Sequence, residues 1–371
     1  MSAVHGIAVV ARGLEDVAAR EIRALGGGMG KTRKDRGRVS FQGPADALLR
    51  ANLLLRSVDR VLAPAGRPFD ANSSLELTRA ARELPWERWI GDRPVRVAAS
   101  VRACRLYHTG AIEDAIREAL VYRGIAVPDE GDDPVTIDVR GTANRWTLAV
   151  DSTGASLHRR GYRKATARAP LRETLAAACL LRMEWSGDVP FLDPMCGSGT
   201  FVGEAASLAA RRPPGLDRSF AFEHWPSYDA AAWEAVVGRA VARIRALPAA
   251  VAGGDVSPAS VKAARGNLQR LDIAGVSVTQ RRLEDTPPDD GPGVILANPP
   301  YGKRISPGRE LAAAQGEWRA WANKLRALRP NQTIFLLSPD QALAEAAGAE
   351  GRPLLRFSNG GIPVALVRLS S

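Results

Sequence analysis

The second half of the chain alternates apolar segments of strand length with helix-length segments, and this is the strongest constraint on the fold. Such alternation predicts a doubly wound, mostly parallel α/β sheet. An Asn359-Gly360-Gly361 turn between two apolar segments predicts an antiparallel hairpin at one edge. The expected elements are strand 189–192, helix 199–210, strand 251–254, helix 258–271, strand 276–279, strand 294–297, helix 309–328, strand 333–337, helix 341–347 and hairpin segments 354–357 and 364–369.

The first half has shorter units and no such regularity. Strands followed by helices in short units predict an α+β platform rather than one large sheet. We expect the connection between the two halves in the basic stretch that begins at Arg159. The expected elements are strand 5–10, a helix from Gly13 to the Gly26-Gly27-Gly28 stop, strand 38–41, helix 44–55, a helix closing at 86–89, strand 95–99, helix 109–123 and hairpin strands 135–139 and 146–150.

The first polar motif, Asp193 to Thr200, directly follows an apolar strand and directly precedes a helix. Ligands of open α/β sheets bind beyond the carboxyl ends of the strands, where glycines allow close approach to the backbone. A carboxylate at Asp193 suits a cationic or hydroxyl-bearing ligand. The motif lacks the ending of a P-loop and the third glycine of a dinucleotide fingerprint. The same residues could form a tight strand-to-helix turn with no ligand.

Acidic residues also follow the next two strands. Asp255 ends the strand at 251–254, where a carboxylate can accept hydrogen bonds from both hydroxyls of a ribose. It could instead belong to the N-cap region of the helix after Ser257. The pair Glu284-Asp285 follows the third strand and could bind an adenine amine or be an ordinary loop acid pair.

The third motif is Asn298-Pro299-Pro300-Tyr301, at the end of the strand 294–297. Two consecutive prolines end both strand and helix, so we expect the Asn298 amide and the Pro299 carbonyl to point into the crevice. These two oxygens can accept both protons of an exocyclic amine, and Tyr301 can stack on the same base. The motif alone could be a turn, but its place in a series of motifs on successive strand ends favours function.

The chain is strongly basic, with a formal net charge of +11 and a sequence pI near 10.2. A charge this far from neutral predicts a polyanionic partner. A genome biased toward arginine could supply part of the excess.

Composition excludes several classes of protein. No run approaches the roughly 18 apolar residues of a membrane span, and the N-terminus lacks a signal-peptide pattern. Three widely spaced cysteines argue against a disulfide framework and favour a reducing cytoplasm. The four histidines show no metal-ligand spacing, so we expect no metal, and no extended heptad calls for a partner chain, so we expect a monomer.

The motifs at 193–200 and 298–302 resemble those of class I methyltransferases that bind S-adenosylmethionine, and Asn-Pro-Pro-Tyr marks the branch that methylates amino groups of bases. The stretches 157–163 and 169–178 are similar to THUMP-domain methyltransferases, especially the enzyme half that makes N2-methylguanine in bacterial 23S ribosomal RNA. The likeness covers nearly the whole chain and weakens before about residue 157. The larger ribosomal enzyme of this family carries a second methyltransferase domain that this sequence does not include, so a tRNA target stays open.

The resemblance implies a ferredoxin-like element over residues 1–60, a THUMP RNA-binding domain over 61–156, and a Rossmann-like class I methyltransferase domain over 157–371. The linker and first helix of that last domain would take about 157–186. It also implies S-adenosylmethionine as cofactor, with Asp255 at its ribose and Asp285 at its adenine. The cofactor-binding residues it implies are Pro170, Leu171, Glu173, Asp193, Cys196, Gly197, Gly199, Thr200, Asp255 and Asp285.

Two further features concern the RNA. Basic residues near the motifs are candidates for phosphate contacts: Arg159, Arg160, Arg163, Lys164, Lys303 and Arg304. The insert 211–247 is rich in aromatic residues, which we interpret as packing against the sheet, with a wall of the base pocket as the alternative.

The expected reaction is in-line transfer of a methyl group to the N2 amine of a guanine in RNA, with 23S ribosomal RNA as the favoured target. Asn298, Pro299, Pro300 and Tyr301 would form the catalytic loop. Three alternatives stay open: a tRNA guanine-N2 methyltransferase, an adenine-N6 methyltransferase, and a non-catalytic RNA-binding factor of ribosome assembly.

Overall fold

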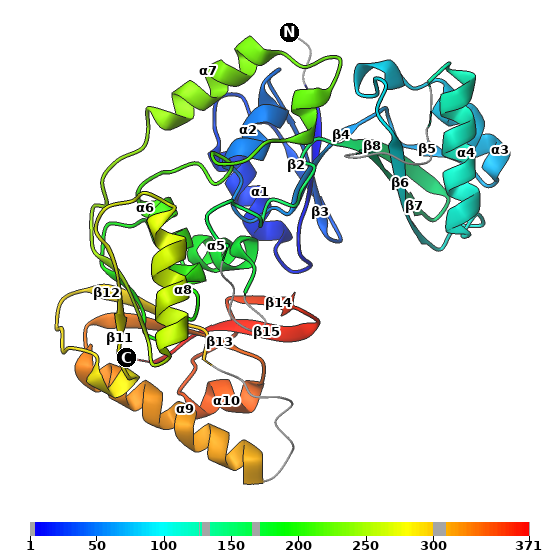
Figure 1. Ribbon diagram of the computed structural model, residues 1–371. Helices are drawn as coiled ribbons and strands as arrows, with labels where there is room; N and C mark the ends of the chain where they lie inside the picture. Colours follow the sequence, from blue (N-terminus) through cyan, green and yellow to red (C-terminus); the bar gives the residue numbers. More distant parts are fainter. Residues whose placement is uncertain (1–3, 126, 128–133, 165–170, 300–308, 371) are drawn as a thin grey trace.

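The described residues form two β-sheets with helices packed on them (Figure 1). The computed structural model describes residues 4–125, 127, 134–164, 171–299 and 309–370. Five residues that the sequence assigned to the site lie outside these ranges: Pro170, Pro300, Tyr301, Lys303 and Arg304.

In the part of the chain that the structure describes, the first sheet contains eight strands in the order β2-β3-β1-β4-β8-β7-β6, with β5 paired to β8. The strands are β1 (Val4–Val9), β2 (Thr32–Asp35), β3 (Arg38–Gly43), β4 (Arg60–Pro64), β5 (Phe69–Asp70), β6 (Val95–Arg102), β7 (Val135–Thr142) and β8 (Arg145–Asp151). β7 and β8 form the antiparallel hairpin that the sequence predicted.

The expectation of a platform without one large sheet is wrong. β4 pairs antiparallel with β8, with Leu62 opposite Asp151 and Ala63 opposite Val150, so the strands on either side of this junction belong to one sheet. The junction strands carry buried residues on both faces, and Ile7, Leu62 and Ala149 form a small core of their own. Burial on both faces favours a central position in a sheet.

Helices cover the first sheet at its two ends (Figure 1). α3 begins after Ser73, whose hydroxyl accepts a hydrogen bond from the Glu76 backbone N–H at 3.3 Å, an N-cap arrangement. The helices are α1 (Glu15–Ala24), α2 (Ala47–Leu54), α3 (Ser74–Arg82), the 3₁₀ turn η1 (Trp86–Arg88) and α4 (Thr109–Tyr122).

Within the described ranges, the second sheet contains seven strands in the order β11-β10-β9-β12-β13-β15-β14. Its central strands are parallel, and β14 and β15 form the predicted antiparallel edge hairpin. The strands are β9 (Phe191–Asp193), β10 (Val251–Asp255), β11 (Val276–Gln280), β12 (Gly293–Ala297), β13 (Gln332–Ser338), β14 (Leu355–Asn359) and β15 (Ile362–Arg368). The predicted doubly wound α/β class is confirmed.

Helices lie on both faces of this sheet, and the strand order reverses beside β9, which has β10 on one side and β12 on the other. Such a switch point leaves a crevice at the carboxyl ends of the strands. The helices are α5 (Glu173–Arg182), α6 (Thr200–Ala209), η2 (Ala221–His224), α7 (Ala230–Val241), α8 (Pro258–Gln269), η3 (Leu283–Asp285), α9 (Arg309–Leu328) and α10 (Gln341–Ala346).

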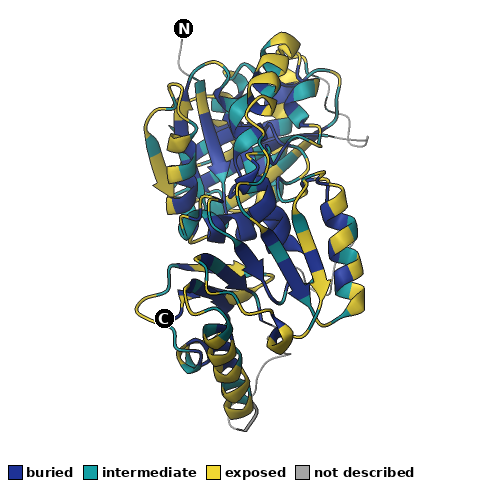
Figure 2. Ribbon diagram, turned by 90° about the vertical axis from the view of Figure 1, so that its left-hand side faces the viewer, coloured by how far each residue is buried: buried dark blue, intermediate teal, exposed yellow. Residues whose placement is uncertain are grey.

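Buried residues follow the strands of both sheets and the helix faces against them (Figure 2). Each half also supplies residues to the core of the other. Leu14 and Val17, at the start of α1, pack in the core of the second sheet.

The aromatic insert 211–247 belongs to the second half of the chain but packs into the core of the first sheet. Phe220 and Phe222 stack with ring centroids 5.3 Å apart and, with Trp225, belong to the core of the first sheet. Trp225 also meets Trp89 edge-on at 6.4 Å. The interpretation as packing is confirmed, but the surface that the insert covers is the N-terminal half rather than the methyltransferase sheet.

Among the helices in the described ranges, none is both long enough and apolar enough to cross a bilayer.

Candidate active site

A cavity of about 740 Å³ opens where β9, β10 and β12 end. This volume lies within the usual range of small-molecule sites. All three polar motifs contribute to its wall, as their positions on successive strand ends predicted. The lining at the ends of these strands includes Asp193, Met195, Cys196, Gly197, Ser198, Asp255, Val256, Asn298 and Pro299.

Asp193 ends β9 and is buried at the base of the cavity. Its Oδ1 accepts a hydrogen bond from the Met195 backbone N–H at 3.0 Å. Burial raises the pKa of Asp193 to about 8, and the nearby charge of Asp255 adds to this rise. Two acids in one low-dielectric site are best stabilised by a cation, because a positive charge favours the ionised carboxylate.

Gly197 joins the first two motifs. Its backbone N–H donates a hydrogen bond to Asp255 Oδ2 at 2.9 Å, and Asp255 Oδ1 accepts one from the Ser257 N–H at 2.8 Å. Gly197 has a φ of 52°, and a Cβ added there would meet no heavy atom within 4 Å. A ligand can therefore approach this part of the backbone. The N-cap of α8 is Ser257, so Asp255 remains available to line the cavity.

Gly199 has a different role from the one that the resemblance implied. A Cβ added to it would lie 3.1 Å from the Ala264 Cβ of α8, and its φ is 84°. It allows α6 and α8 to pack closely, and it is not among the described residues that line the cavity.

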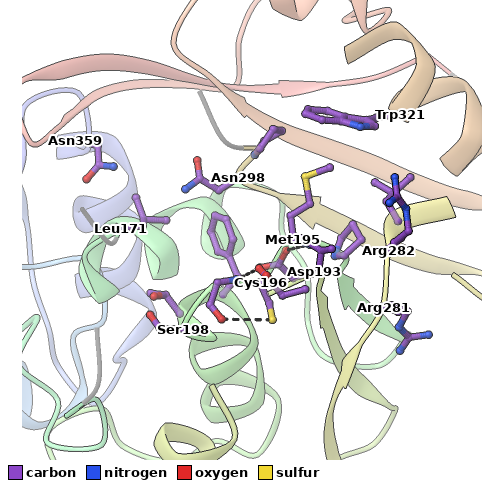
Figure 3. Close-up of a pocket in the computed structure, with 18 of the residues that line it drawn as sticks. Leu171, Asp193, Met195, Cys196, Ser198, Arg281, Arg282, Asn298, Trp321 and Asn359 are labelled. Carbon is purple, nitrogen blue, oxygen red and sulfur yellow. Dashed lines mark hydrogen bonds between the residues drawn. The ribbon is translucent and has the colours of Figure 1, made fainter. Parts of the chain in front are cut away.

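Asn298 follows β12 and lies in the middle of the cavity wall, between Asn359 on one side and Trp321 on the other (Figure 3). Its Oδ1 is buried and has no hydrogen-bond partner among the described residues. An unpaired buried acceptor costs roughly 1–3 kcal/mol. Such an atom is expected where a ligand donates the missing hydrogen bond.

Only one acid of the pair Glu284-Asp285 lines the cavity, and it is not the one that the resemblance implied. In η3, Leu283 and Glu284 line the cavity and Asp285 does not. A 3₁₀ turn has three residues per turn, so adjacent side chains point in directions about 120° apart. Glu284 therefore faces the cavity and Asp285 points away from it.

Glu173 lies behind the cavity wall rather than in it. Its Oε1 is 2.9 Å from Arg163 Nε, and both side chains are buried. The Arg163 guanidinium also donates to the Leu171 carbonyl at 2.8 Å and to Thr200 Oγ1 at 2.7 Å. Leu171 and Thr200 line the cavity, so the Arg163–Glu173 pair positions the wall. Arg163 is therefore not placed for a phosphate contact.

The phosphate role predicted for Arg160 is also wrong. Only 3% of this residue is exposed, and its guanidinium donates to the carbonyls of Leu157 at 2.8 Å and Arg56 at 2.5 Å. It also lies 3.5 Å from Glu204. Arg159 and Lys164 are exposed, and their phosphate role stays a prediction.

Several lining residues carried no signal in the sequence. Asn359 and Gly360 come from the tip of the β14–β15 hairpin, and Trp321 comes from α9. Arg281 and Arg282 come from the segment after β11. Only the fold brings these residues to the strand ends.

Among the described residues there is no cluster of three or more histidine, cysteine or acidic side chains able to hold a metal. Burial raises the pKa of the Cys196 thiol, so this side chain is neutral in the cavity.

Known proteins resemble this chain over its whole length. Residues 160–361 match the family described as the RMKL-like methyltransferase domain, and residues 6–62 match the RlmL ferredoxin-like domain. The chain is 32% identical to slr0064 of Synechocystis sp., provisionally named an RNA methyltransferase, over 97% of this chain and 95% of that protein.

It is also 31% identical to ribosomal RNA large subunit methyltransferase K/L of Allochromatium vinosum, over 95% of this chain and 50% of that enzyme. The chain thus spans about half the length of that relative. Among solved structures, the methyltransferase SMU.472 in complex with S-adenosylhomocysteine matches with a TM-score of 0.88 at 29% identity, covering 100% of this chain and 99% of that one.

The matches confirm the class I methyltransferase fold and the ferredoxin-like N-terminal part that the resemblance implied. The first match alone spans more than half of the residues. The chain therefore belongs to the RMKL-like methyltransferase family.

Proposed function

We propose that this protein is an S-adenosylmethionine-dependent RNA methyltransferase that modifies the exocyclic N2 amine of a guanine. The observation that carries the proposal is the buried Oδ1 of Asn298, which lies in a cavity at the switch point of the sheet and has no hydrogen-bond partner among the described residues. An acceptor without a donor suits a ligand that brings N–H groups, as an exocyclic amine does.

The other end of the cavity suits the cofactor. Asp193 and Asp255 can face its positive charge and its ribose hydroxyls, and the open backbone at Gly197 leaves room beside them. When bound there, S-adenosylmethionine supplies a methyl group on a positively charged sulfur. Leu283 and Glu284 would contact its adenine.

The described residues would promote the reaction by orienting the amine. Asn298 Oδ1 and the Pro299 carbonyl oxygen would accept the two amine protons and hold the nitrogen lone pair toward the methyl group. Alignment of this kind replaces a strong base, because the nitrogen becomes acidic as it is alkylated and then loses its proton. A base must leave its helix to reach the cavity, at a cost of a few kcal/mol.

RNA is favoured as substrate by the names of the two curated relatives and by the net charge of +11. The K/L relative favours 23S ribosomal RNA as the target, with tRNA as the second candidate. We also propose that residues 61–156 form a THUMP domain that binds RNA, and that the protein is a monomer. Three free thiols suit a reducing cytoplasm.

The test is an incubation of the purified chain with methyl-labelled S-adenosylmethionine and unmodified ribosomal RNA, transfer RNA or DNA. Mass spectrometry then identifies the labelled nucleoside. N2-methylguanosine in one RNA fraction is the expected result. N6-methyladenine would overturn the base assignment, and cofactor binding with no label in any fraction would favour an RNA-binding assembly factor.

A further inference from the structure

A second cavity, of about 610 Å³, lies where the N-terminal half meets the edge hairpin of the second sheet. One side is formed by α1, which presents Asp16, Arg20 and Arg23 at helical spacing, so they share one face. The other side is formed by Arg182 at the end of α5 and by Arg356 on β14. We call this cavity the arginine groove.

The groove is electropositive. Four arginines line it against one acid, Asp16, which is paired with Lys34 at 2.5 Å and so brings another cation to the rim. Arg20 lies 3.4 Å from Glu184, but the Arg20 side chain is 46% exposed and that of Glu184 is 74% exposed, and ion pairs at the surface are weak. Arg23 donates only to the neutral Thr32 hydroxyl, at 2.7 Å, among the described contacts.

The arginine groove and the candidate active site are separate cavities, and β14 contributes to both. Arg356 is exposed on this strand, and Asn359 at its end lines the active-site cavity. Three residues of strand span about 10 Å. A nucleic acid strand with one base in the active site would therefore have neighbouring phosphates within reach of Arg356.

Close packing fixes the two sides of the groove relative to each other. Gly13 has a φ of 93°, and a Cβ added there would collide with the Arg356 carbonyl oxygen. Arg182 Nε donates to the Leu354 carbonyl at 3.0 Å. The arginines are thus held on a rigid frame made by both halves of the chain.

We propose that the arginine groove binds the RNA backbone next to the target nucleotide, through Arg20, Arg23 and Arg356. This inference rests on the proposed function and names where its substrate is held. The groove takes the role that sequence had assigned to Arg160 and Arg163, which are buried. An acidic protein segment would fit the same charge, but closeness to the active-site rim favours RNA.

The test uses the full chain without cofactor and a fluorescent 20-nucleotide single-stranded RNA of mixed sequence, titrated at several salt concentrations. The variant is Arg23→Ala with Arg356→Ala. The matched control is Arg243→Ala with Arg270→Ala, two exposed arginines that do not line the groove. S-adenosylhomocysteine affinity is measured for each protein as a check on folding.

Each phosphate contact on a single strand contributes about 0.7 to the slope of log affinity against log salt. The groove variant should therefore have a slope shallower by about 1.4 and bind roughly 20-fold more weakly at 0.1 M salt. The control variant and all cofactor affinities should stay within about twofold of the unmodified chain.

If the groove variant still binds cofactor and its slope of log affinity against log salt is unchanged, the proposed RNA-binding role of the groove is overturned. The methyltransferase proposal is then unaffected. Loss of affinity for a polyglutamate peptide with no loss for RNA would also overturn the RNA-binding role, in favour of a protein partner. If the unmodified chain binds no RNA, the proposed function fails with it.

Discussion

The Nε atom of Arg163 lies 2.9 Å from Glu173 Oε1, and this buried pair supports the wall of the active-site cavity from behind. Arg163→Met leaves the Glu173 carboxylate buried without its partner. Removing one member of a buried ion pair typically costs about 3–5 kcal/mol, so we expect a loss of that size in the free energy of unfolding, measured with urea.

Arg159→Ala is the matched control, because Arg159 is exposed in the same basic stretch and should change stability little. If Arg163→Met keeps its stability and loses only RNA affinity, Arg163 is a phosphate contact after all. The double variant Arg163→Met with Glu173→Leu should recover part of the lost stability.

Asn298→Ala should lower the rate of methyl transfer by about 10²–10³-fold, the cost typical of removing one well-placed polar group from a reacting centre. Cofactor affinity should change by less than about twofold, because the Asn298 oxygen is assigned to the amine. Single-turnover kinetics and calorimetry measure the two effects separately. Equal losses in both would mean that Asn298 holds the cofactor.

Cofactor affinity should depend on the proton of Asp193. Burial raises the pKa of this carboxyl to about 8, so it is protonated in the free protein at neutral pH. A bound cation favours the carboxylate, and binding must then release the proton. Affinity for S-adenosylmethionine should therefore rise from pH 6 to pH 8, by at most tenfold per unit, and level off above.

Calorimetry in two buffers with different ionisation enthalpies would detect the released proton. Asp193→Asn should flatten the pH profile and weaken binding at pH 8.5. A flat profile in the unmodified protein would place the positive charge of the cofactor away from Asp193.

The neighbouring acids of η3 give a matched pair of variants. Glu284 lines the cavity and Asp285 does not. Glu284→Ala should weaken S-adenosylhomocysteine binding by about tenfold, since hydrogen bonds to charged groups contribute about 1.5–3 kcal/mol and this one is partly exposed to solvent. Asp285→Ala should have no effect on calorimetric affinity, and the reverse order would restore the assignment from resemblance.

The sequence predicts the local elements of the second half closely. The helix expected at 309–328 is α9, and the turn at Asn359-Gly360-Gly361 joins the β14–β15 edge hairpin. Alternation and turn chemistry are local properties, so they can be read along the chain. The three polar motifs that line the cavity could be placed for the same reason, because each lies at the end of a strand.

Long-range pairing could not be read in this way. Nothing near β4 indicates its register with β8, which lies about 90 residues further along. Charge also carries no information on burial. Arg160 and Arg163 are interior residues because Glu204 and Glu173 lie opposite them, and those partners are supplied by two other helices.

The exchange of core residues between the two halves limits how the protein can be divided. A fragment that starts at residue 157 would carry Phe220, Phe222 and Trp225 without the core that buries them, and would lose Leu14 and Val17 from its own. Both fragments of such a cut would expose large apolar surfaces and tend to aggregate. The two halves have separate sheets, but because they share core residues we expect them to unfold together.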